Sequence, residues 1–232
     1  MNCEKYQLRS TIDTVLSINT GSRSVRLACY RVANDTIEPV QRYHIDETET
    51  AIDPLPVLRS LSAPSMVAHR WVHGGEWLTG QRRYRAEDAE ALEKLTALAP
   101  LHNPKAHRWL LATMDCWPDA AQILIPDTGF FRSMPEVAWR LPLPRTLCRE
   151  HSLRRYGFHG LAHASLWRAL REREPIRAAG RVLTLQLGGG CSAAALLNGR
   201  PCDTSMGYGI YTLSGDEERE LCEQALALER LT

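Results

Sequence analysis

The chain of 232 residues opens with short strand-like runs of apolar residues and continues with segments of helical periodicity. The first runs, at residues 14–19, 24–32 and 36–43, predict an antiparallel meander with a tight turn at 20–23. Further strands are expected at 65–72, 121–125, 181–187, 192–197 and 200–203, and helices at 51–60, 85–99, 104–116, 161–173 and 215–229. Strands that first meander and then alternate with helices are typical of an α/β protein with a mixed sheet.

Two lobes are expected from this order of elements. Residues 14–175 contain the meander and the first alternating elements, whereas residues 176–232 begin with a second hairpin and end with a charged helix. The second hairpin, at 181–203, turns at Asn198-Gly199 and echoes the first, which agrees with a fold of two similar lobes, the second of them incomplete. Residues 1–13 are polar and patternless and are expected to be a loose extension.

Composition and charge argue against several classes of protein, namely nucleic-acid-binding, membrane-spanning and secreted proteins. A formal net charge of +1 gives no electrostatic reason to expect nucleic acid as the main partner. The apolar runs have the length of strands, so no membrane span is expected, and the first residues lack the apolar region of a signal peptide. Seven cysteines without any CxxC pair fit a reduced setting, so a cytoplasmic protein is expected.

A turn of small polar residues, Asn19-Thr-Gly-Ser-Arg-Ser24, joins the first two expected strands. Backbone N–H groups and the hydroxyls of Ser22 and Ser24 could cradle phosphate oxygens there. Arg26 on the following strand would direct a positive charge to the same place. An ordinary hairpin turn and a solvated arginine remain alternatives. The glycines at 188–190 form a second candidate phosphate turn, for which a tight hairpin is likewise an alternative.

Charged residues stand at the ends of two expected strands. Arg70, followed by His73 and two glycines, could pair bidentately with a carboxylate, or could be a structural arginine that caps a loop. Asp127 stands at a carboxyl end, where open α/β sheets place ligand groups, although an N-cap or turn role is equally consistent. His102 and His159 lie among Pro, Asn and Gly, which indicates loops and leaves structural roles open.

Several blocks together, in this order, resemble the acetate kinase (carboxylate kinase) family. The most informative is Arg155-Tyr-Gly-Phe-His-Gly with His163. The other blocks that carry the resemblance are residues 18–24, 69–76, 98–104, 125–129, 131–135 and 203–207. The family belongs with sugar kinases, Hsp70 and actin, of ribonuclease H-like fold, in which two related lobes enclose a cleft. The resemblance therefore implies a mixed-sheet lobe and the beginning of a second, incomplete lobe.

The resemblance also implies a role for each matching residue. Asn19 corresponds to a magnesium-linked asparagine, and Arg26 to a phosphate-contacting residue that is usually lysine. Arg70 corresponds to the substrate arginine, Asp127 to the catalytic aspartate and His159 to the transition-state histidine. The implied acyl pocket is lined by Val72, Leu101 and Phe158. The implied second phosphate loop consists of Gln186, Leu187, Gly188, Gly189 and Gly190.

The chain departs from the family pattern at three places. Gln186 and Gly189 replace a histidine and an asparagine of the second phosphate loop, and Phe131 replaces a histidine after the catalytic aspartate. After Gly207 the match stops, and residues 213–221 look like a later family segment joined on after a deletion. We therefore expect a chain that is C-terminally truncated or internally deleted, with much of the nucleotide lobe missing.

The implied reaction is the reversible transfer of the γ-phosphate of ATP to acetate or propionate, with Mg²⁺, giving an acyl phosphate and ADP. A degenerate remnant that binds a carboxylate or another protein is the alternative. The partners expected are a short carboxylate and ATP or ADP, together with a second copy or another chain that covers the incomplete lobe.

Overall fold

A computed structural model describes residues 14–207 except 23, 34–35, 47–51 and 189. The expected extension at 1–13 and the expected helix at 215–229 lie outside the described residues. Within the described part, no helix is long and apolar enough to cross a membrane.

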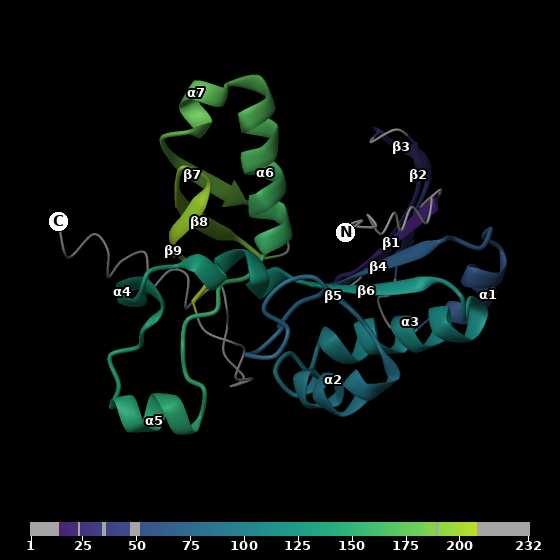
Figure 1. Ribbon diagram of the computed structural model, residues 1–232, viewed down its shortest axis with the longest axis horizontal. Helices are drawn as coiled ribbons and strands as arrows, with labels where there is room; N and C mark the ends of the chain where they lie inside the picture. Colours follow the sequence, from purple (N-terminus) through teal and green to yellow (C-terminus); the bar gives the residue numbers. More distant parts are fainter. Residues whose placement is uncertain (1–13, 23, 34–35, 47–51, 189, 208–232) are drawn as a thin grey trace, which may run out of the picture.

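A six-stranded mixed sheet forms the first half of the fold (Figure 1). Its strands, in sheet order, are β3 (Thr36–Asp46), β2 (Ser24–Ala33), β1 (Thr14–Thr20), β4 (Met66–Trp71), β6 (Ala121–Pro126) and β5 (Arg82–Arg83). The pairs β1–β4 and β4–β6 are parallel, whereas β1–β2, β2–β3 and β5–β6 are antiparallel. The expected meander and the mixed sheet are both confirmed.

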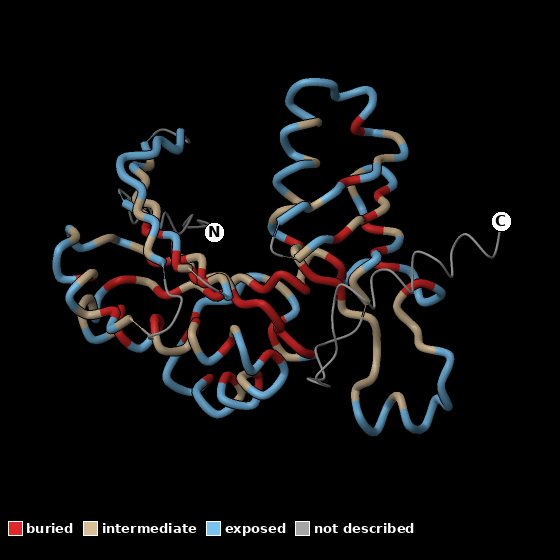
Figure 2. The backbone as a smooth tube through the Cα atoms, turned by 180° about the vertical axis from the view of Figure 1, so that it is seen from behind, coloured by how far each residue is buried: buried red, intermediate tan, exposed pale blue. Residues whose placement is uncertain are grey.

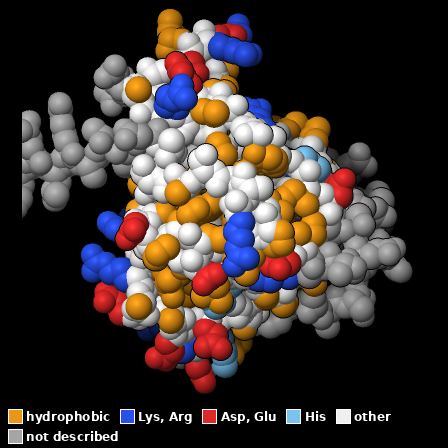
Figure 3. Space-filling model, turned by 90° about the vertical axis from the view of Figure 1, so that its right-hand side faces the viewer, with side chains coloured by type: hydrophobic (Ala, Val, Ile, Leu, Met, Phe, Trp, Pro, Cys, Tyr) orange, Lys and Arg blue, Asp and Glu red, His pale blue; other side chains and the backbone are white. Residues whose placement is uncertain are grey.

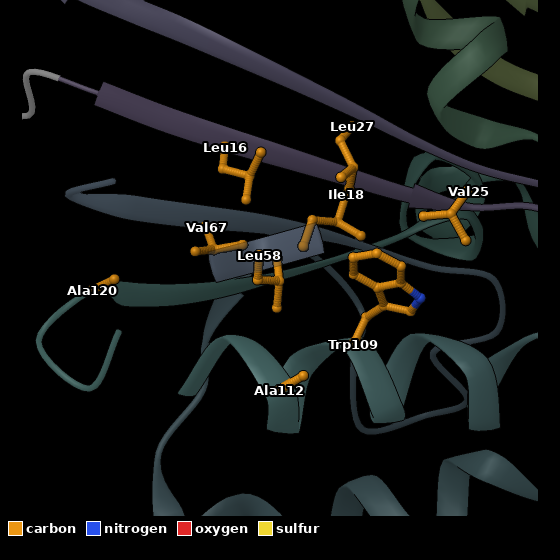
Figure 4. Close-up of a cluster of buried hydrophobic side chains, with 9 residues drawn as sticks. All are labelled: Leu16, Ile18, Val25, Leu27, Leu58, Val67, Trp109, Ala112 and Ala120. Carbon is orange, nitrogen blue, oxygen red and sulfur yellow. The ribbon is translucent and has the colours of Figure 1, made fainter. Parts of the chain in front are cut away.

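Helices α1 (Pro54–Arg59), α2 (Ala89–Thr96) and α3 (Asn103–Cys116) lie on one side of this sheet (Figure 1). Period-two alternation directs Leu16 and Ile18 of β1 toward these helices, where Trp109 of α3 is fully buried against them (Figure 4). The rest of this cluster comprises Val25, Leu27, Leu58, Val67, Ala112 and Ala120. A second cluster, with Trp71, Leu92 and Leu110 among its members, continues the same core along α2 and α3.

The helix expected at 85–99 is shorter than its apolar pattern indicated. Residues Ala86–Asp88 form a 3₁₀ turn, and Asp88 Oδ2 accepts from the backbone N–H of Arg85 at 3.0 Å, so that α2 proper begins at Ala89. At the other end, the side-chain amide of Asn103 donates to the Leu95 carbonyl at 2.6 Å. The α-helix ends at Thr96 because the chain turns there toward α3.

The second half of the fold contains the antiparallel sheet β7 (Arg181–Gln186), β8 (Ser192–Leu197) and β9 (Arg200–Thr204), which confirms the expected hairpin. Helix α6 (Gly160–Arg173), the short α7 (Pro175–Ala178) and the 3₁₀ segment η2 (Asp127–Ser133) pack near this sheet (Figure 1). Their shared core comprises Phe131, Met134, Ala194 and Leu196 with partly buried Phe130, Trp139, Trp167 and Val182.

Burial is uneven across the two halves (Figure 2). Strand β3 is one of the two edges of the large sheet, and Ile37 and Val40 on it are 67% and 58% exposed. The short helix α4 (Glu136–Trp139) packs near β9, whereas α5 (Arg145–Glu150) protrudes and has no buried residue (Figure 1). On the face drawn in Figure 3, acidic and basic side chains are interspersed, in keeping with the small net charge.

Candidate active site

The carboxyl ends of the three parallel strands meet at one edge of the large sheet. Asn19 is the second-last residue of β1, Arg70 is the second-last residue of β4, and Asp127 directly follows β6. Parallel strands place their carboxyl ends side by side, so residues far apart in the sequence become neighbours. The three expected site residues are therefore brought together by sheet topology.

Arg70 and Asp127 form the central ion pair of this edge. Nε and Nη2 of Arg70 donate to the same oxygen, Oδ2 of Asp127, at 3.0 and 2.6 Å. Nη1 of Arg70 donates to Oδ1 of Asn19 at 3.2 Å and to the Thr20 carbonyl at 3.3 Å. The Asp127 side chain is 1% exposed and that of Arg70 16%, so the guanidinium is the part that a ligand can reach.

The second oxygen of Asp127 connects this edge to helix α6. Oδ1 accepts from the backbone N–H of Leu161 at 3.3 Å, in the first turn of the 14-residue helix. A carboxylate is favoured there because the N-terminal N–H groups and the helix dipole are positive. Gly160 permits this approach, since a Cβ at that position would overlap the Asp127 carbonyl oxygen.

His159 lies immediately before α6 in a left-handed conformation, with φ of 56°. Its Nδ1 is 2.9 Å from Oγ of Ser192 at the start of β8, and its Cε1–Nε2 edge faces Gly190. Burial lowers the pKa of His159; the Asp127 carboxylate opposes this effect and the Arg70 guanidinium reinforces it. The histidine thus lies between the ion pair and the second candidate phosphate turn.

A small apolar cluster contains residues that are close in sequence to Arg70 and to His159. Val72 and Phe158, both expected in the acyl pocket, pack with Ala99 and Met206. Leu101, the third expected lining residue, is 63% exposed and is not a member of this cluster.

His73, next to this cluster, is buried with its ring 4.5 Å from that of Tyr156 and 5.4 Å from that of Phe158. Its Nδ1 accepts from the Gly75 N–H at 3.0 Å, and burial lowers its pKa to about 4. His73 therefore acts as a neutral wall residue beside the apolar cluster.

The segment after β9 is held against the segment before α6. The N–H of Tyr156 donates to the Gly207 carbonyl at 2.9 Å, and Arg155 forms an ion pair with Asp203 at 3.0 Å. These contacts bring Met206 from the second half of the chain to Phe158. Two of the blocks that carry the family resemblance are thereby joined in space.

The first candidate phosphate turn is closed by a hydrogen bond from Gly21 N–H to the Ser24 carbonyl, at 2.8 Å. Ser22 is exposed and Ser24 partly buried, and Arg26 is paired with Asn19 across the ladder, so both side chains share one face. Lys105 of α3 also reaches this turn, since its Nζ donates to the Gly21 carbonyl at 2.9 Å. Sequence analysis missed Lys105 because it lies 84 residues from Gly21 along the chain, in a helix with no signal of this contact.

The second turn connects β7 to β8. Gln186 ends β7, Leu187 and Gly188 are exposed, and Gly190 faces His159. Gly189 lies outside the described residues. Sequence analysis placed Ser192 at the end of the second candidate turn but did not predict its contact with His159, because a serine at a strand start carries no signal of the histidine that it contacts. A separate pocket of about 250 Å³ is lined by residues of α4, α5 and the following loop, and does not include the Arg70–Asp127 pair.

Solved structures with a similar fold include an acetate kinase and a propionate kinase. An acetate kinase from Porphyromonas gingivalis matches with a TM-score of 0.69 and 28% identity, covering 84% of this chain and 57% of that one. A propionate kinase from Francisella tularensis matches with a TM-score of 0.69 and 26% identity over the same shares. The fold class is thus confirmed as the α/β fold of these kinases, which is the class expected from the sequence.

The sequence comparisons identify the family. The model of the Acetokinase family matches residues 47–215. The acetate kinase of Ectopseudomonas mendocina is 40% identical over 176 residues, which cover 72% of this chain and 45% of the relative. That of Micrococcus luteus is 35% identical over 214 residues, covering 84% and 55%. The chain belongs to the acetokinase family, and it spans about half the length of these relatives.

Proposed function

We propose that this chain supplies the acyl-substrate side of a carboxylate kinase, which transfers the γ-phosphoryl group of ATP to acetate or propionate. The observation that carries the proposal is the meeting of the Arg70–Asp127 pair, His159 and a small apolar cluster at one sheet edge. The solved structures that resemble this chain include those of an acetate kinase and a propionate kinase. Because the chain covers about half of its relatives, the activity of the whole enzyme is part of this proposal.

The reaction requires little proton transfer. A carboxylate is already ionised near neutral pH, and its oxygen would attack the γ-phosphorus while the bond to the β–γ bridging oxygen breaks. The products, an acyl phosphate and ADP, carry the same total charge as the reactants. The contribution of the protein is therefore to hold two anions in line and to offset negative charge on the transferring group.

Arg70 would orient the carboxylate. Four of its N–H groups are engaged by Asp127, Asn19 and Thr20, so one Nη2 N–H remains for a ligand unless Asp127 yields its contacts. Substrate binding is expected to redistribute these bonds. Val72 and Phe158 would receive the alkyl group, and His159 would offset charge on the phosphoryl group.

The residues present fit Mg²⁺ held mainly by phosphate oxygens and water. Among the described residues, no group of three or more His, Cys, Asp or Glu side chains could hold a metal. Asn19 and Asp127 offer hard oxygen donors at one edge, and Mg²⁺ commonly uses one or two such protein ligands with substrate phosphates. When bound, the ion would neutralise phosphate charge.

The test is acyl phosphate formation trapped as hydroxamate, with acetate, propionate and butyrate as acceptors. We expect activity with the two shorter acids, because the apolar cluster is small. A discrimination of only about 1–3 kcal/mol per methylene predicts a modest preference between acetate and propionate. No acyl phosphate with any of the three acids, from a folded chain that binds acetate, would contradict the proposal.

A carboxylate-binding protein without turnover is the second candidate function. The feature that favours it is the second turn, where Leu187 is 74% exposed and Gln186 is uncharged, so this turn offers no cationic side chain to a triphosphate. We accordingly propose weak ATP binding. Calorimetric titration with acetate and with ATP separates the two candidates, since a low-micromolar dissociation constant for ATP would argue against the second.

A further inference from the structure

A continuous chain of polar contacts runs from His159 into the interior of the second half. His159 Nδ1 is 2.9 Å from Ser192 Oγ, and that oxygen is 2.8 Å from Nε2 of His163. Nδ1 of His163 is in turn 2.8 Å from Oγ1 of Thr184. Beyond His159, every member is buried: His163 is 0%, Ser192 5% and Thr184 6% exposed.

The last member of the chain fixes the direction of all its hydrogen bonds. Oγ1 of Thr184 donates to the Ala194 carbonyl at 3.3 Å, and a carbonyl can only accept. The single hydroxyl hydrogen of Thr184 is used there, so Nδ1–H of His163 must donate to Thr184. Nε2 of neutral His163 is then an acceptor, and Ser192 donates its one hydrogen to it.

The same reasoning reaches His159. Because the hydrogen of Ser192 points to His163, Oγ of Ser192 can only accept from His159, whose Nδ1 must therefore carry the proton. A neutral imidazole has one N–H, so Nε2 of neutral His159 bears a lone pair. This nitrogen lies on the ring edge that faces Gly190.

We propose that Ser192, His163 and Thr184 are positioning residues that lock neutral His159 in the Nδ1–H tautomer, with Nε2 presented to Gly190. The inference rests on the proposed function, in which His159 meets the transferring phosphoryl group. Neutral His159 cannot donate to a phosphoryl oxygen in this tautomer. Only the imidazolium can, so protonation of His159 at Nε2 and binding of the phosphoryl group are coupled.

The burial of the two histidines and the charges near His159 are consistent with this coupling. Burial lowers the pKa of His163 and that of His159, so both rings are neutral before an anion arrives. The charged groups that act on His159 are the Asp127 carboxylate and the Arg70 guanidinium. The ring of Phe131 lies 5.8 Å from that of His163 in an edge-on arrangement. The buried Phe131 thus helps to shield the chain of polar contacts from water.

The test is direct observation of the tautomer by long-range ¹H–¹⁵N correlation in protein labelled at the histidine ring nitrogens, at about pH 8. His159→Gln assigns the signal. We expect a protonated Nδ1 and an unprotonated Nε2 in the parent chain. Thr184→Val, which keeps the volume and removes the hydroxyl, should shift His159 to a mixture or to Nε2–H, whereas Thr184→Ser should preserve the parent pattern.

Two results would overturn the inference: an Nε2–H tautomer in the parent chain, or a His159 pattern that Thr184→Val and Ser192→Ala both leave unchanged in folded protein. In kinetic measurements, we expect Thr184→Val to lower turnover about tenfold and to retain the acetate KM. The reason is that His159 would no longer be held in the tautomer that directs Nε2 to the phosphoryl group. Absence of kinase activity in the parent chain would count against the proposed function alone, since the tautomer measurement requires no turnover.

Discussion

Lys105 of α3 and Gly21 of the first turn are 84 residues apart in the sequence, yet Nζ of Lys105 donates to the Gly21 carbonyl at 2.9 Å. The same nitrogen is 3.5 Å from the Ser22 carbonyl. The contact fixes the turn between β1 and β2 to the helical layer and places a positive charge beneath it. We propose that this contact pre-organises the turn for a phosphate group.

Lys105→Met should therefore weaken ATP use more than acetate use. We expect the KM for ATP to rise about fivefold to tenfold, in line with roughly 1–1.4 kcal/mol for one charge-assisted contact at a partly exposed site. Lys105→Arg, which retains the charge, is the matched control. Steady-state kinetics with ATP varied at saturating acetate checks the expectation, and equal ATP KM values for Lys105→Met and the parent would contradict it.

Replacement of Arg70 and of Asp127 should separate binding from turnover. Arg70→Ala is expected to raise the acetate KM by the equivalent of about 1.5–3 kcal/mol, because a charge-assisted contact to the carboxylate is lost. Asp127→Asn should mainly lower kcat, because Arg70 and the α6 terminus lose the carboxylate that positions them. The hydroxamate assay measures both, and unchanged parameters in both variants would refute the assignment.

The same pair makes a prediction for stability. Among the described residues, Arg70→Ala leaves the buried carboxylate with the Leu161 N–H as its remaining donor, so the free energy of unfolding should fall by about 3–5 kcal/mol. Asp127→Asn retains an acceptor oxygen for Arg70 and should cost less. Urea unfolding of the two variants ranks these losses, and the reverse order would show that the pair is not the main support of Asp127.

Much of this edge could be predicted from the sequence, for a physical reason. Alternating apolar residues predict β1, β4 and β6, and Asp127 was expected at a carboxyl end, where open α/β sheets place ligand groups. Only the family resemblance placed Asn19, Arg70 and Asp127 in one site, because the parallel pairing that brings them together was not predicted. The roles of the individual site residues stay predictions. Exposed Leu101 shows that a position within a matching block does not fix the direction of its side chain.

Other contacts could not be read from the sequence. Lys105 reaches the first turn, and Ser192 lies between two histidines, only because separate elements pack together. Neither residue stands in a periodic or turn pattern of its own. The spacing of His159 and His163 did carry a signal, since residues four apart near a helix start lie on one side of it.

Stability should fall with decreasing pH because of buried histidines. Burial lowers the pKa of His69 and of His73 from 6.5 to about 4, so the folded state keeps both neutral where the unfolded chain takes up protons. Stability is thus full above about pH 6.5 and is lost toward pH 4, by up to about 1.4 kcal/mol per pH unit for each histidine. Urea titrations across this range measure the slope.

His69→Gln is the control for that slope. In the parent, His69 Nε2 lies 2.8 Å from Oε1 of Gln122, and a glutamine amide can donate to the same oxygen without titrating. The free energy of unfolding of the variant should depend less steeply on pH, because one of the two titrating histidines is removed. A slope identical to that of the parent would place the acid sensitivity elsewhere.

Gly160→Ala should disturb the site although it adds a single methyl group. The new Cβ would overlap the Asp127 carbonyl oxygen and would lie 2.7 Å from Cβ of Phe130, so α6 must shift away from Asp127. We expect a loss of about 1–3 kcal/mol in stability together with reduced turnover. Gly180→Ala, whose Cβ would lie 3.4 Å from the Arg177 carbonyl oxygen, is the matched control and should be tolerated. Equal behaviour of the two alanine variants would contradict the packing argument.

The last prediction concerns the outer face of the second sheet. Leu183 and Leu185 alternate with Thr184 on β7, so both point away from the core and are 66% and 52% exposed. Strand β7 is also an edge of its sheet, and an apolar edge strand favours pairing with another strand.

We predict that the purified chain self-associates by pairing of its β7 with β7 of a second copy. The double variant Leu183→Lys and Leu185→Lys should shift sedimentation velocity profiles toward monomer, because like charges would face each other across the contact. Leu166→Lys, on exposed α6, is the control that should leave association unchanged. A parent chain that sediments as a monomer at all concentrations would remove the basis of this prediction.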